Sequence, residues 1–160
     1  MQAEPQKEHR WLEQLVGEWT YESEASMGPD QPPGKFTGKD AVRSLGGLWV
    51  ICEGEGDAPG GGTSQMIITL GYDPAKQRFV GSFIGSSMAS MWLYEGQLDP
   101  SGKVLTLDTE GMSFTGDGGT SKYQDVVEIL SEDHRTLSSR VLGDDGQWTT
   151  FMTAHYHRVR

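Results

Sequence analysis

Closely spaced turn signals constrain this chain of 160 residues more than any other feature of its sequence. Asp73-Pro74, Asp99-Pro100 and Asp145-Gly146 are examples, and glycine and proline recur between them. Proline presets the first corner of a turn, and glycine readily adopts the positive φ that tight hairpins need. Connections this short join antiparallel neighbours, because a parallel crossover needs a dozen or more residues.

Between the turn signals, side chains alternate between apolar and polar or form short apolar runs, which is typical of strands. Ten strands are predicted, over residues 18–27, 35–45, 48–56, 63–72, 78–86, 90–98, 103–110, 122–131, 135–142 and 147–158. One of the predicted turns lies at residues 116–119. A short helix is predicted before the strands, because Trp11, Leu12, Leu15 and Val16 recur at helical spacing and Gly17 ends the run.

Ten long strands leave two exposed edges unless the sheet closes on itself. The predicted fold class is therefore all-β, a single antiparallel up-and-down β-barrel of about ten strands with a short N-terminal helix, and residues 1–160 form one domain. Glycine supplies 22 residues, roughly twice the usual share, and glycines within strands permit bends and close approach. A barrel of this strand number has room for a ligand cavity.

Charge and cysteine content limit the partners and the compartment. Thirteen basic against 23 acidic residues give a net charge of −10, which argues against a nucleic-acid partner. No apolar run reaches the length of about 18 residues that a membrane span needs, so no membrane partner is expected. The first ten residues lack the apolar segment of a secretion signal, and Cys52 has no disulfide partner. A cytoplasmic protein with a buried, unreactive Cys52 is expected.

The segment Leu15-Val16-Gly17-Glu18-Trp19-Thr20-Tyr21 places a Gly-x-Trp motif between the predicted helix and the first strand. This arrangement resembles the calycin superfamily, the lipocalins and their relatives. The resemblance implies a lipocalin-like barrel in which Trp19 packs across the closed end and has a structural role.

The whole chain is also similar to a bacterial family, the domain-of-unknown-function family fifteen-seventy-nine. The similarity is carried by residues 28–33, 44–50, 70–73 and 151–156. Membership of this family implies the lipocalin-like fold and no established activity.

A more distant resemblance is to nitrobindin-type barrels, which also open with Gly-x-Trp and bind haem through a histidine on the last strand. His155 and His157 lie on the corresponding predicted strand, whereas Tyr21 stands where those proteins have a second glycine. The two histidines are two residues apart and therefore share a face, so they are candidate ligands for haem or another metal. Solvated surface histidines and an acid–base role are the alternatives.

Large apolar side chains within the strands are the candidates for contacting an apolar ligand in the barrel. They are Trp49, Met66, Trp92, Tyr94 and Tyr123. Arg43 and Arg140 lie in the middle of predicted strands and, on an inner face, would bind a ligand carboxylate through two hydrogen bonds. The alternatives are a filled core for the aromatic residues and a solvated outer face for the arginines, since the sequence pattern does not show which strand face points inward.

The leading functional prediction is a binding protein for a small, largely apolar molecule, with no catalytic residue and no cofactor assigned. Hydrolase and nucleotide motifs are absent: Gly81 to Gly85 lacks the Gly-x-Ser-x-Gly spacing, and Gly38-Lys39 is followed by Asp40 instead of Ser or Thr. The alternatives are haem or metal binding through the histidine pair with redox or isomerase activity, a small enzyme with a polar barrel cavity, and an interaction domain in which two barrels pair as a homodimer.

Overall fold

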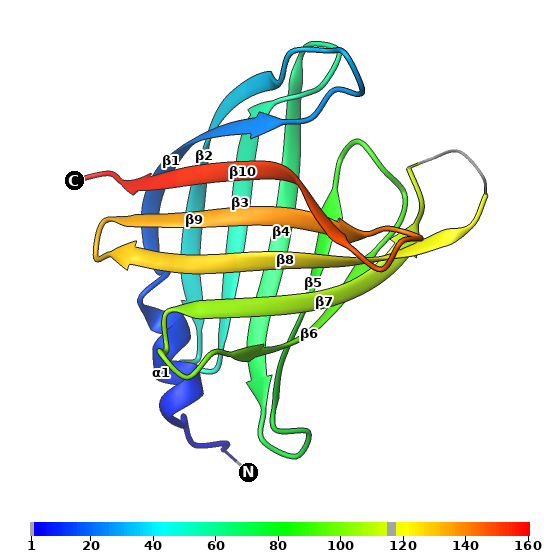
Figure 1. Ribbon diagram of the computed structural model, residues 1–160. Coiled ribbons are helices and arrows are strands. Elements are labelled where there is room, and N and C mark those ends of the chain that lie inside the picture. The colour runs from blue at the N-terminus through cyan, green and yellow to red at the C-terminus, as the bar shows by residue number, and fades with distance from the viewer. Residues whose placement is uncertain (1, 115–117) are drawn as a thin grey trace.

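The backbone forms one helix and ten strands within residues 2–114 and 118–160, which a computed structural model describes (Figure 1). The helix α1 spans Lys7–Glu13. The strands are β1 (Gly17–Ala25), β2 (Gly34–Leu45), β3 (Trp49–Asp57), β4 (Thr63–Asp73), β5 (Arg78–Gly85), β6 (Trp92–Leu98), β7 (Val104–Met112), β8 (Thr120–Ser131), β9 (His134–Leu142) and β10 (Trp148–Arg158). Every predicted strand is present, and each of its ends lies within two residues of the predicted position.

The ten strands close into a single antiparallel barrel in which each strand pairs with its neighbour in the chain. Closure is made by β1 and β10, where Trp19 lies opposite Arg158 and Tyr21 lies opposite Tyr156. The predicted all-β up-and-down barrel is therefore confirmed. Residues 116 and 117 of the predicted turn at 116–119 lie outside the described residues. No helix in the described ranges has the length and apolarity needed to cross a membrane.

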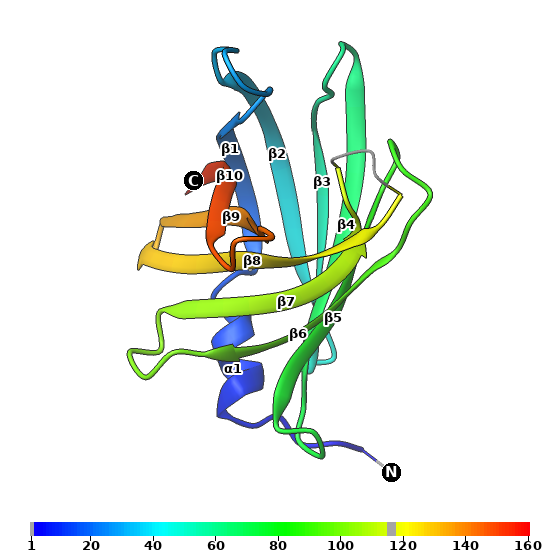
Figure 2. The ribbon, with the colours of Figure 1, turned by 45° about the vertical axis from the view of Figure 1, so that its right-hand side comes forward.

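The helix α1 lies at one end of the barrel, which we call the closed end (Figure 2). Leu12 of α1 and Leu15, which lies two residues beyond its end, are buried in the core. Two further contacts fasten α1 to the barrel: His9 Nε2 lies 3.0 Å from the Tyr72 carbonyl oxygen, and Trp11 Nε1 donates to the Gly102 carbonyl at 2.6 Å. The helix thus covers the end of the barrel at which the β4–β5 and β6–β7 turns lie.

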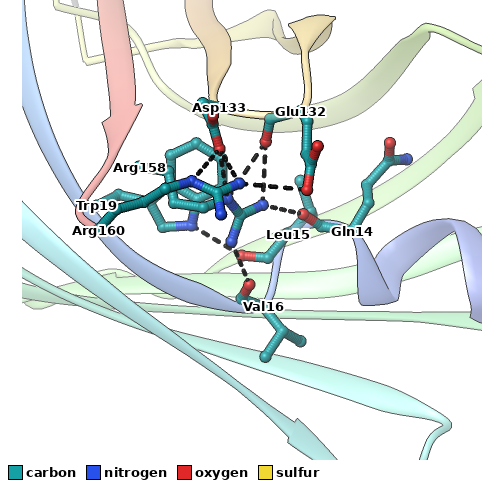
Figure 3. Close-up of polar contacts among 8 residues, drawn as sticks. All are labelled: Gln14, Leu15, Val16, Trp19, Glu132, Asp133, Arg158 and Arg160. Carbon is teal, nitrogen blue, oxygen red and sulfur yellow. Dashed lines mark hydrogen bonds and ion pairs between the residues drawn. The ribbon is translucent and has the colours of Figure 1, made fainter.

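Trp19 and Arg158 lie against the segment that follows α1, near Leu15 and Val16 (Figure 3). The indole of Trp19 is 2% exposed and donates to the Leu15 carbonyl at 2.9 Å. The guanidinium of Arg158 lies 4.2 Å from the Trp19 ring centroid and donates to the carbonyls of Val16, at 2.7 Å, and Gln14, at 2.9 Å. Gly17 is required beside them, because its φ is +142° and an added Cβ would collide with the Arg158 guanidinium.

A second arginine continues this arrangement into the barrel. Arg135 lies between two rings, with its guanidinium carbon 4.6 Å from the Trp19 centroid and 4.2 Å from the Tyr156 centroid. It also pairs with Asp40 across the barrel at 3.2 Å, and both side chains are at most 10% exposed. Burial raises the pKa of Asp40 above its ordinary value, although the Arg135 charge opposes this shift. The pair is a buried charge interaction at the base of the barrel interior.

We expect Asp40→Ala to lower the free energy of unfolding by about 3–5 kcal/mol, because it leaves the Arg135 charge buried and unpaired. The measurement is urea unfolding followed by tryptophan fluorescence. The control is Arg43→Ala, which breaks the exposed pair between Arg43 and Glu53 on the outer face and should cost less than about 1 kcal/mol. Equal losses in the two variants would contradict a special role for the buried pair.

Candidate ligand-binding cavity

A cavity of about 330 Å³ occupies the half of the barrel away from α1. The closed half is filled by large buried side chains, among them Trp19, Phe79, Leu105 and Leu107. Toward the other end, the inward positions of the strands carry side chains that line a space instead of filling it. The barrel is thus packed at the end covered by α1 and hollow toward the opposite end.

Aromatic rings dominate the walls of this cavity. They belong to Tyr21, Phe36, Phe83, Trp92, Tyr94, Phe114, Tyr123, Phe151 and Tyr156. Tyr123 joins several of them, because its ring centroid lies 5.3 Å from that of Trp92, 5.7 Å from that of Phe114 and 6.1 Å from that of Phe151. Met66, Met88 and Met152 are among the further apolar side chains of the lining. Such walls suit an apolar or aromatic ligand.

A carboxylate stands among these apolar walls. Asp125 on β8 accepts a hydrogen bond from Ser139 Oγ on β9 at 2.6 Å and another from the Tyr94 hydroxyl on β6. Burial raises the pKa of Asp125 above its ordinary value, and both hydrogen bonds oppose the shift. Burial also raises the pKa of Tyr94 well above its usual value, and the nearby Asp125 adds to this. Tyr94 therefore stays a neutral donor, and Asp125 is a polar anchor in the cavity.

The charged groups of the cavity are all acidic. Besides Asp125, the lining includes Asp57, which accepts hydrogen bonds from the backbone N–H of Thr37 at 2.9 Å and from its hydroxyl at 3.3 Å. No lysine, arginine or histidine is among the described residues that line the cavity. The Thr109 hydroxyl also belongs to the lining and has no hydrogen-bond partner within the described residues.

Four of the predicted ligand-binding residues come together here. Met66, Trp92, Tyr94 and Tyr123 all line the cavity, because each occupies an inward position of its strand. Sequence reasoning did not assign Asp125 to the site, since a carboxylate in the middle of a strand is equally compatible with either face. The available signal was its spacing of two residues from both Tyr123 and Val127, which places the three side chains on one face.

The predictions for Trp49, Arg43 and Arg140 are corrected by the strand register. Arg43 lies on the outer face and pairs with Glu53, and Arg140 donates to Gln124 Oε1 at 2.7 Å, with its guanidinium 5.6 Å from the Trp148 centroid. Trp49 is 39% exposed and its ring covers Gly71 from outside. Successive side chains of a strand point to opposite faces, and the adjacent Val42, Ser139 and Val50 take the buried positions.

The two C-terminal histidines also lie on the outer face. His155 Nδ1 is 2.9 Å from His134 Nε2, and the ring of His157 stacks on that of His134 with centroids 4.5 Å apart. Burial and the two neighbouring imidazoles lower the pKa of His134. No group of three or more metal-ligating side chains within residues 2–114 and 118–160 is arranged to hold a metal ion. His155 and His157 do not fit the ligand of a haem inside the barrel, because Ala154 and Tyr156 occupy the inward positions.

Cys52 lies at an inward position of β3 within the packed core. Burial, followed by the charge of Asp40, raises the pKa of its thiol from 9.0 to about 12. The thiolate fraction near neutral pH is therefore far below that of an unperturbed thiol.

We expect Cys52 to resist thiol-specific reagents in the folded protein and to react rapidly in denaturant. The measurement is the rate of colour development with an aromatic disulfide reagent at pH 8, with and without guanidinium chloride. A native rate close to the denatured rate would contradict the burial of this thiol.

The geometry thus defines a closed ten-stranded β-barrel with an internal, aromatic-lined cavity and an acidic anchor. The chain belongs to the family described as protein of unknown function (DUF1579), whose model matches residues 4–158. The family predicted from the sequence is therefore confirmed. No protein of curated function matches the sequence.

Solved structures share this fold at low sequence identity. Rv2717c from M. tuberculosis superposes with a TM-score of 0.69 at 14% identity, covering 98% of this chain and 100% of that one. EF1p2_mFAP2b bound to DFHBI gives a TM-score of 0.51 at 12% identity, with 95% and 99% coverage. The redesigned β-barrel mFAP0 bound to DFHBI gives 0.50 at 12% identity, with 91% and 99% coverage. At these identities, the likeness extends to the fold alone.

We expect Asp125→Asn to stabilise the ligand-free protein near neutral pH. The pKa of Asp125 is higher in the folded protein than in the unfolded chain, where it is about 3.9. Ionisation of Asp125 therefore lowers the free energy of unfolding as the pH rises from about 3.9 through the folded-state pKa. The asparagine variant lacks this loss. The measurement is the difference in unfolding free energy between variant and parent at pH 4 and pH 7, and a difference that does not grow with pH would contradict the assignment.

Proposed function

We propose that this protein binds a small, largely apolar molecule within its barrel. The observation that supports the proposal best is the cavity of about 330 Å³, which combines aromatic walls with a hydrogen-bonded carboxylate. Ligand sites are commonly apolar cavities with a few convergent polar groups that fix orientation. In this arrangement the rings would supply most of the affinity, and Asp125 and Tyr94 would orient the ligand.

The size of the cavity limits the ligand. A volume near 330 Å³ is at the small end of the range for ligand pockets, roughly 300–1,000 Å³. A ligand of two or three aromatic rings, or a comparable aliphatic body, fits this space. The two barrels that resemble this chain and are bound to DFHBI support the idea that such a fold can hold a small molecule.

We place this binding in the cytoplasm, without a nucleic-acid or membrane partner. The net charge of −10 opposes contact with phosphates, and the protein's single cysteine is buried as a free thiol.

The proposal is tested with a neutral apolar dye, N-phenylnaphthylamine, whose fluorescence rises in apolar surroundings. We expect saturable enhancement with the parent protein and at least about tenfold weaker binding to Ser23→Trp, since Ser23 lines the cavity and the indole would fill it. The matched control is Thr20→Trp on the outer face of the same strand, which should bind as the parent does.

Circular dichroism establishes that both variants fold before their binding is compared. Absence of saturable dye binding to the parent protein, or equal binding to the Ser23→Trp variant, would contradict the proposed function.

A further inference from the structure

The carboxylate of Asp125 has unused hydrogen-bonding capacity that faces the cavity. Its Oδ1 accepts from Ser139 and its Oδ2 accepts from Tyr94, whereas an ionised carboxylate offers about four acceptor positions. Both donors are neutral hydroxyl groups. These hydrogen bonds therefore orient the carboxylate but do not neutralise its negative charge.

No cation of the protein compensates this charge within the described residues. The lining of the cavity contains no basic side chain, and Asp125 forms no ion pair. Arg135 on the adjacent strand β9 is buried, but its guanidinium pairs with Asp40 at 3.2 Å and contacts the rings of Trp19 and Tyr156. A carboxylate removed from water without a partner is costly, so a cationic partner would relieve the cost.

The aromatic walls around Asp125 also favour a positively charged ligand. The faces of tryptophan, tyrosine and phenylalanine rings attract cations, and Trp92, Tyr123 and Phe83 share this cavity with Asp125. Asp57 adds a second negative charge to the lining. A ligand carboxylate would meet two acidic groups and no basic one, which disfavours fatty acids and related anions.

We propose that the ligand of this barrel is an apolar molecule that carries a protonated amine. The ammonium donates to the free acceptor positions of Asp125, and the apolar body contacts the aromatic walls. This inference rests on the proposed binding function and specifies the chemical class of the ligand.

The test compares one apolar body with three head groups, the β-naphthyl series of naphthylmethylammonium, naphthylmethanol and naphthoate, by isothermal titration calorimetry at pH 7. We expect the amine to bind at least about tenfold more tightly than the alcohol, as a charge-assisted hydrogen bond allows, and the carboxylate to bind most weakly. In the Asp125→Asn variant, the preference for the amine over the alcohol should disappear.

The control for general charge removal is Glu128→Gln, an exposed position on the outer face of the same strand, where the preference should persist. Equal binding of amine and alcohol to the parent, or loss of the preference in the Glu128→Gln variant as well, would overturn the inference. Binding of the neutral dye separates the two proposals: if the dye binds and the amine has no advantage, the barrel binds ligands but the amine class is wrong.

Discussion

The contact of Trp19 with two guanidinium groups is the interaction on which the closed barrel depends. Trp19 comes from the first strand, Arg158 from the last and Arg135 from the strand before it, so the stack spans the seam where β1 meets β10. Arg158 also donates to carbonyls at and after the end of α1, where helical carbonyls lack partners within the helix. One cluster therefore joins the seam and the helix.

The same stack determines where the cavity begins. The guanidinium of Arg135 contacts the ring of Tyr156, and that ring lies 5.2 Å from the ring of Tyr21. Both tyrosines contribute to the cavity lining. Below them the interior is filled by buried apolar side chains. A packed base of this kind holds the strands in fixed register, so Tyr94, Asp125 and Ser139 meet from three strands in a defined geometry. The polar anchor is thus a consequence of the rigid end of the barrel.

Much of the fold could be predicted from the sequence because antiparallel hairpins are encoded locally. Asp99-Pro100 and Asp145-Gly146 favour turns through their local backbone preferences, and the strand lengths follow from the spacing between such turns. The site was less accessible. Trp92 and Tyr94 were identified as strand residues with suitable side chains, but the same reasoning admitted Trp49 and Arg140, which lie outside the barrel. Alternation divides a strand into two faces without showing which one is inside.

The sequence by itself determined the ten strands, their antiparallel order and the presence of aromatic side chains within them, since these depend on residues close together in the chain. Only the tertiary structure decided that Asp125 faces the cavity with Tyr94 and Ser139, and that Arg43, Arg140, His155 and His157 do not. Closure of the sheet fixes the register of all ten strands at once, and a shift of one residue would exchange the inner and outer faces. Which charges meet inside is therefore a property of the closed barrel, because it depends on pairs of residues that are distant in sequence.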